Sequence, residues 1–222
     1  MRHALRAGGI AIAAVALGLA LAGCGSDEKK AEETTTSAAA PTPPAPGAGP
    51  NKTIVDYVKE NGITETPVRR GEPGSPTVNM PIPPGWEDTG PRAPQWAWGQ
   101  VFFTDPALAA DPPTITMLMS KLTGPVEPAK IMEFAPGEIK NLPGYQGEGN
   151  GIAATLGGFE AWQVSGTYMK GDVRRAVAQK TVAIPGQDAL FVLQLNADAA
   201  EPQMGVLAEA TTVIDQNTTI TP

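Results

Sequence analysis

Histidine and cysteine, which often serve as general base and thiol nucleophile, each occur once in this chain of 222 residues. The only histidine is His3 and the only cysteine is Cys24. A Ser-His-Asp triad, a Cys-His pair and a histidine-based zinc or iron site all need an imidazole in the folded part. Ser120 and Lys121 are neighbours on a predicted strand, so their side chains leave opposite faces and cannot form a catalytic pair. The chain also lacks a Gly-x-Ser-x-Gly motif, a phosphate-binding loop and a dinucleotide fingerprint. We therefore expect neither an enzyme nor a bound cofactor.

Carboxylates are the remaining candidates for chemistry. Two acids suffice for glycoside hydrolysis, and Glu148, Glu160 and Asp172 could meet across hairpins. Asp105 and Asp111 flank a proline-rich loop, but they lack the dense acidic spacing of a calcium loop. Solvated charges at strand ends explain these residues better, so we expect no metal site.

Aromatic and methionine side chains show a more informative pattern. They recur at alternate positions of three predicted strands, and such side chains on a curved sheet can line an adaptable slot for acyl chains or sugar faces. Ordinary core packing beneath the helices is the alternative interpretation. The predicted ligand-binding set is Trp96, Trp98, Phe102, Met117, Met119, Trp162 and Tyr168.

The elements that must position these residues alternate between helical and extended patterns. Helices are predicted at 54–61, at 127–141 with a break near Pro136, and at 201–216. Strands are predicted at 77–80, 96–104, 114–122, 152–155, 159–169, 173–184 and 189–197. Tight turns at 170–172 and 185–188 indicate two consecutive antiparallel hairpins. The order predicts an α+β fold, with a central antiparallel sheet and helices packed against it.

Cys24 closes a short basic and apolar leader. An uncharged run from 7 to 22 follows Arg6, and the run ends in Leu21-Ala22-Gly23-Cys24. This layout resembles a bacterial lipoprotein signal, in which the cysteine thiol accepts a diacylglyceryl group. A transmembrane helix is the alternative, since the run approaches the ~20 residues that a span requires. We expect residues 1–23 to be a signal peptide and Cys24 to be the lipidation site.

Residues 24–50 change to a composition that cannot bury a core. They are rich in Pro, Ala, Thr and charged residues and are predicted to be a disordered tether. Residues 51–222 are predicted to form a single globular domain. That part has 12 Lys and Arg against 19 Asp and Glu residues, which makes nucleic acid and anionic headgroups poor partners.

Several stretches of the folded part resemble the mycobacterial LpqN/LpqT lipoprotein family. They are KLTG at 121–124, FAPGE at 134–138, LPG at 142–144, AATLGGFEAWQ at 153–163, FVLQLNADA at 191–199 and TTITP at 218–222. Pro-Pro-Gly-Trp at 83–86 also resembles the entry to the fold of PsbP-type proteins. The resemblance implies an α/β/α sandwich on an antiparallel sheet and offers no catalytic motif to carry over.

The same resemblance implies a lipid-anchored, periplasm-facing protein of the cell membrane. Its expected role is a non-enzymatic binding or adaptor module for mycolate glycolipid trafficking, with a trehalose ester as ligand and an MmpL-type exporter as partner. A second reading is a released or surface-exposed virulence factor that binds a host protein. Fold membership alone does not decide between these readings.

Overall fold

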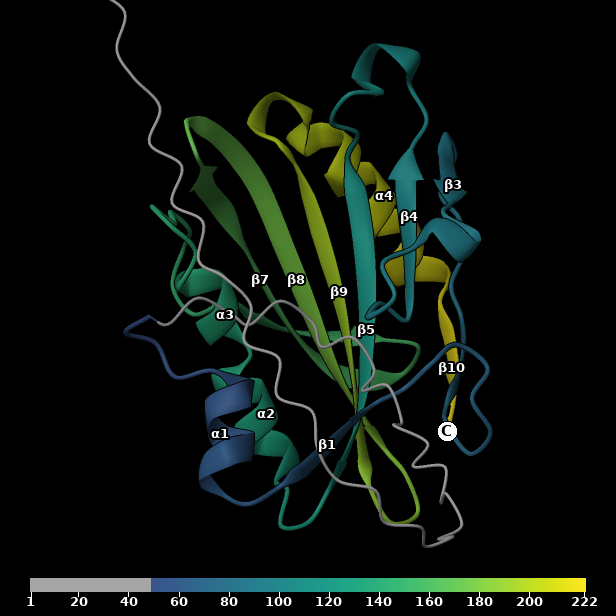
Figure 1. The fold of residues 1–222 in the computed structure, drawn as a ribbon, viewed down its shortest axis with the longest axis vertical. Helices are drawn as coiled ribbons and strands as arrows, with labels where there is room; N and C mark the ends of the chain where they lie inside the picture. Colours follow the sequence, from purple (N-terminus) through teal and green to yellow (C-terminus); the bar gives the residue numbers. More distant parts are fainter. Residues whose placement is uncertain (1–48) are drawn as a thin grey trace, which may run out of the picture. The chain divides into compact units, whose positions relative to one another are not determined.

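The computed structural model describes residues 49–222, and within them an eight-stranded sheet forms the central layer (Figure 1). Its strands follow the order β3-β4-β5-β9-β8-β7-β6, and β1 pairs with β5 outside this path. All of these pairs are antiparallel. The strands are β1 Thr64–Pro67, β3 Trp86–Asp88, β4 Gly99–Phe103, β5 Thr114–Thr123, β6 Ile152–Leu156, β7 Phe159–Lys170, β8 Val173–Pro185 and β9 Leu190–Ala200.

Helices cover both faces of this sheet. One face carries α4, and the other carries α1, α2 and α3 (Figure 1). The helices are α1 Ile54–Glu60, α2 Pro128–Phe134, α3 Pro136–Lys140 and α4 Met204–Asn217. Beside them, β2 Thr77–Asn79 and β10 Thr219–Thr221 form a separate two-stranded sheet. The α+β class and the helix–sheet–helix layering expected from the sequence are confirmed.

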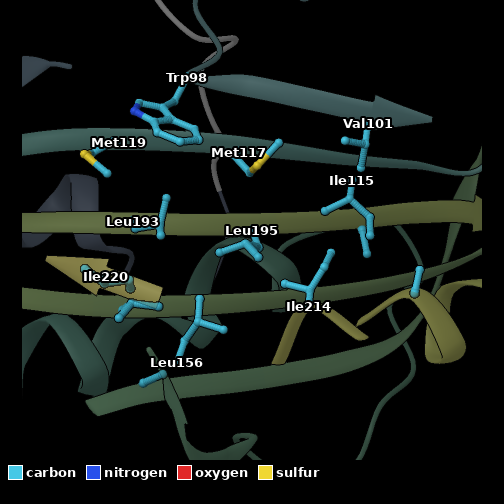
Figure 2. Packing of buried hydrophobic residues seen from close by; sticks show 14 of the residues in the cluster. Trp98, Val101, Ile115, Met117, Met119, Leu156, Leu193, Leu195, Ile214 and Ile220 are labelled. Atoms are coloured by element: carbon cyan, nitrogen blue, oxygen red, sulfur yellow. The ribbon is translucent and has the colours of Figure 1, made fainter. Parts of the chain in front are cut away.

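Strand alternation divides the core between the two faces. On the α4 face, Met117 of β5 and Leu193 of β9 pack with Ile214 of α4 (Figure 2). On the opposite face, Leu122 and Val192 from the same two strands pack with α1 and α2. Both faces therefore carry an apolar cluster beneath their helices.

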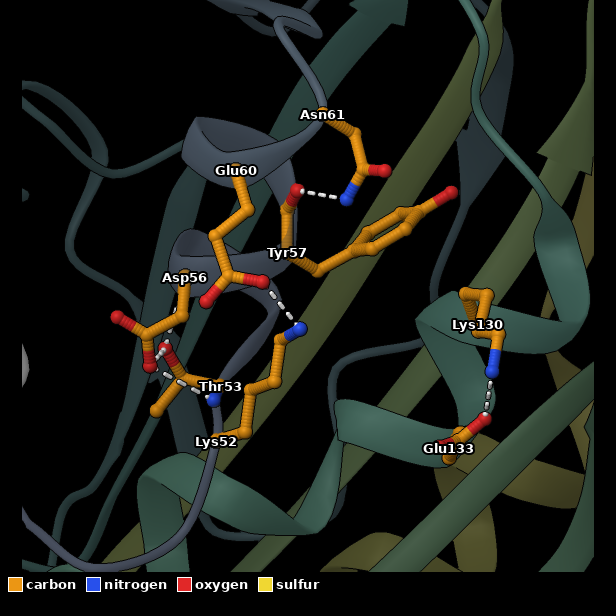
Figure 3. Close-up of polar contacts among 8 residues, drawn as sticks. All are labelled: Lys52, Thr53, Asp56, Tyr57, Glu60, Asn61, Lys130 and Glu133. Carbon is orange, nitrogen blue, oxygen red and sulfur yellow. Dashed lines mark hydrogen bonds and ion pairs between the residues drawn. The ribbon is translucent and has the colours of Figure 1, made fainter.

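The first helix begins with a reciprocal cap. The Thr53 hydroxyl accepts a hydrogen bond from the Asp56 N–H at 3.2 Å, and the Asp56 carboxylate accepts from the Thr53 N–H at 2.9 Å (Figure 3). These bonds satisfy donors that a helix start leaves unpaired and hold the pKa of Asp56 below its usual value. Two exposed ion pairs lie nearby: Lys52, just before α1, pairs with Glu60 at the end of α1, and Lys130 pairs with Glu133 on α2 (Figure 3).

A break between α2 and α3 fixes the position of α3. Pro136 starts α3, and a side chain at Gly137 would collide with the backbone oxygen of Lys52. Only glycine permits this close approach, which brings α3 onto the sheet beside α1. The break predicted near Pro136 is confirmed.

Both predicted hairpins are present. Lys170 pairs with Val173 at the turn between β7 and β8, and Pro185 pairs with Leu190 where β8 turns into β9. The structure adds three short strands that the sequence patterns did not predict: β1, β3 and β10. Cys24 and most of the predicted tether lie outside the described residues.

Candidate functional site

Three members of the predicted ligand-binding set lie in the core on the α4 face. Trp98, Met117 and Met119 are 7%, 1% and 3% exposed. They belong to the same hydrophobic cluster as Ile214 of α4 (Figure 2). The indole Nε1 of Trp98 has no hydrogen-bond partner. These side chains are therefore packed as core.

The prediction that Trp96, Trp98 and Phe102 share one face of a strand is wrong. Trp96 and Trp98 lie in a turn and a bend before β4, which begins at Gly99. Within β4, Val101 faces the α4 core while Phe102 points the other way, with the Arg92 guanidinium 5.6 Å from its ring centre. The bend before Gly99 breaks the alternation that the sequence pattern assumed.

The last two members of the set lie on the face that carries α1, α2 and α3. Trp162 packs against the cluster around α1 and α2, and its Nε1 donates to the Asn150 carbonyl at 2.6 Å. Tyr168 packs beside α3 and donates to the Asp198 carboxylate at 2.7 Å. The seven residues are thus split between opposite faces and do not line one slot.

A different group of side chains comes together on this second face. Four polar residues, one from each of four neighbouring strands, lie in register as a row across β4, β5, β9 and β8. We call them the polar row: Gln100, Thr116, Asn196 and Gln179. Gln100 donates to Thr116 at 2.8 Å, and Gln179 donates to Asn196 at 2.9 Å. Gln100, Thr116 and Asn196 are half-buried, and Gln179 is buried.

Glu138 of α3 closes one end of the polar row. Its carboxylate accepts hydrogen bonds from Gln179 at 3.2 Å and from Gln194, on the next register of β9, at 3.4 Å. Burial raises the pKa of Glu138, the two amide donors act in the opposite direction, and the charges of Glu65 and Asp56 raise it further. This carboxyl group therefore keeps its proton to a higher pH than an exposed glutamate does.

Buried polar atoms in and beside the polar row lack partners. They are Oε1 of Gln179, Nδ2 of Asn196 and Oγ1 of Thr181. Gln179 is 2% exposed and Thr181 is 0% exposed. An unpaired buried polar group costs about 1–3 kcal/mol, so these three atoms lower the stability of the fold unless a partner reaches them.

Apolar side chains flank these amides along the next register. Half-buried Leu118 lies opposite Gln194, and half-buried Trp162 lies opposite Thr181. The face therefore offers hydrogen bonds at the polar row and apolar contacts immediately beside it. This pairing of surfaces suits a ligand with a hydroxyl-rich head and a hydrocarbon part.

An ion-pair network ends the same face. Arg175, 4% exposed, donates to Asp198 at 2.7 Å and to Asp111 at 2.6 Å. Burial and the bond to Asp198 raise the pKa of Tyr168 to about 12. Asp111 is thus bound to an arginine, while Asp105 caps a short helix through the Ala107 N–H at 2.9 Å. The two aspartates take part in separate structural contacts.

The three carboxylates considered for hydrolysis are Glu148, Glu160 and Asp172, and all are exposed. Within residues 49–222, no cluster of three or more potential metal ligands is present. In the same range, no helix has the length and apolar character needed to cross a membrane.

Comparison with known proteins gives the chain its family. A family model described as "Probable lipoprotein LpqN" matches residues 50–221. Lipoprotein LpqN of Mycobacterium tuberculosis (strain ATCC 25618 / H37Rv) is 56% identical over 175 residues, which cover 79% of this chain and 76% of that protein. A crystal structure titled as LpqN involved in cell envelope biogenesis of Mycobacterium tuberculosis matches with a TM-score of 0.74 and 56% identity, covering 78% of this chain and 100% of that one. This chain belongs to the LpqN lipoprotein family.

Proposed function

We propose that this protein is a non-enzymatic binding module of the mycobacterial cell envelope that holds a mycolate-type glycolipid, a trehalose ester, for transfer to an MmpL-type exporter. Its relative with a solved structure is described as involved in cell envelope biogenesis, which supports a role in the same compartment. In this proposal residues 1–23 are a signal peptide, Cys24 carries the lipid, residues 24–50 are a tether, and 51–222 form the binding domain.

The observation that carries the proposal is the polar row with its unpaired amide atoms. Sugar hydroxyls donate and accept hydrogen bonds, so they match the free acceptor of Gln179 and the free donor of Asn196. The acyl part of the ester would lie on Leu118 and Trp162, beside the row.

Calorimetric titration of residues 51–222 with trehalose monooctanoate tests the proposal. The crystallised relative aligns over its whole length with 78% of this chain, so this segment is the part expected to fold alone. Asn196→Leu removes one donor and one acceptor from the row and should weaken binding by about 1–3 kcal/mol. Gln187→Leu, an exposed amide in the turn between β8 and β9, is the matched control.

Equal affinity of wild type and a folded Asn196→Leu variant would contradict the proposed site. Transfer to an exporter is tested separately, by cross-linking the lipid-anchored protein in intact envelopes. A cross-link to an MmpL-type protein is expected, and a saturating reaction that yields none would contradict that part of the proposal.

A further inference from the structure

A second candidate site lies outside the polar row. A pocket of about 340 Å³ opens between the segment after β1 and the loop that leads into β4. Arg69 and Arg70 form one wall, with Asp88 and Trp98 beside them. Prolines Pro91 and Pro94 supply an apolar rim. None of these residues belongs to the polar row.

Arg70 is held in place on three sides. Its guanidinium lies 4.7 Å from the ring centre of Trp98, and its Nη1 donates to Asp88 at 2.7 Å. A side chain at Gly99 would collide with its Nη2, so glycine there leaves the space that the guanidinium fills. The arginine is therefore positioned before any ligand arrives.

The charges of the pocket do not cancel. Asp88 also accepts a hydrogen bond from the Gly90 N–H at 2.8 Å. Partial burial raises the pKa of Asp88, but the hydrogen bonds from Arg70 and Gly90 lower it more, so the pKa lies below its usual value. One carboxylate thus stands against two guanidinium groups. Arg69 donates from Nη1 to the Gln95 carbonyl, and its other side-chain N–H groups have no acceptor within residues 49–222.

We propose that this pocket binds the oxyanion of a small amphiphilic ligand, a phosphate ester or a carboxylate. Arg69 supplies free N–H donors in the forked geometry that matches such groups, and Arg70 adds a fixed positive charge. The proline rim contacts the apolar stem of the ligand. The net charge of −7 works against anionic surfaces in general, but the lining gives this one concavity a positive sign.

The test is calorimetric titration of the mature lipidated protein, in nonionic detergent, with phenyl phosphate, benzoate, inorganic phosphate and neutral benzyl alcohol. Saturable binding of phenyl phosphate or benzoate is expected, and the tighter of the two identifies the oxyanion class. Arg69→Gln should weaken that binding about ten- to hundredfold, the range for losing a charged hydrogen bond. Arg92→Gln is the matched control, because Arg92 lies in the same loop region and is not part of the lining.

Three outcomes would overturn the proposal. One is that neither phenyl phosphate nor benzoate binds saturably. Another is that Arg69→Gln and wild type bind the anion with equal affinity. The third is equal affinity for inorganic phosphate and phenyl phosphate, which would remove the role of the apolar rim. Trehalose ester binding should be unchanged in Arg69→Gln, so failure here is distinguishable from failure of the polar-row site.

Discussion

Replacement of Trp98 by alanine distinguishes a core tryptophan from one that lines a lipid slot. Trp98 is 7% exposed and belongs to the cluster of Met117, Met119 and Val101 on the α4 face. Removing a buried tryptophan side chain costs about 3–5 kcal/mol, because contacts are lost and a cavity remains. For a folded part of this size each kcal/mol lowers Tm by about 2–4 °C, so we expect a drop of roughly 6–20 °C.

Urea and thermal unfolding followed by circular dichroism measure this loss. Trp96→Ala is the control, since Trp96 is only half-buried in the turn before β4 and should cost clearly less. A Trp98→Ala variant that loses under about 1 kcal/mol while glycolipid binding falls would refute the assignment of Trp98 to the core, and would restore it as a ligand contact.

Three further predictions concern the anchor, the polar row and catalysis. Cys24→Ser should yield a protein without acyl mass that leaves the detergent phase; a mutant that still carries acyl chains would contradict lipidation there. Because burial raises the pKa of Glu138, the folded state binds this proton more tightly than the unfolded one, so the contribution of Glu138 to stability falls as pH rises above about 4.3 towards the raised pKa. In urea unfolding, the free energy of unfolding of Glu138→Gln relative to wild type should therefore rise with pH across this range, and a difference that does not change with pH would argue against it. Residues 51–222 should hydrolyse neither acyl esters nor glycosides in a substrate screen; turnover abolished by Glu160→Gln would indicate a carboxylate enzyme.

The long hairpins of the sheet could be predicted from sequence because their signals are local. Strands β7, β8 and β9 are 12, 13 and 11 residues long and are joined by short turns that contain glycine. By contrast, β1 is Thr-Glu-Thr-Pro and exposed throughout. Its strand character comes from pairing with residues 120–123 of β5, which no local pattern reveals.

The candidate site was harder to predict because it also depends on contacts between segments far apart in the sequence. Alternation placed Met117 and Met119 on one face correctly, but the bend at Trp98 cannot be read from spacing. The polar row depends on the register of four strands. Its centre forms only because Thr116 of β5 pairs with Asn196 of β9, about 80 residues later in the chain. One local signal was available, since Gln194 interrupts the apolar run from Phe191 to Leu195, and an amide in such a run needs a hydrogen-bond partner.

The central claim is that a glycolipid head binds at the polar row. The most direct test is a heteronuclear NMR titration of ¹⁵N-labelled residues 51–222 with trehalose monooctanoate, following the side-chain amides. The proposal predicts saturable shifts for the side-chain amides of Gln179 and Asn196 in the row. It predicts the same for Gln194, which is bonded to Glu138 beside the row, while the exposed amide of Gln187 stays unmoved. Saturation of the protein with these three amides unshifted would contradict it.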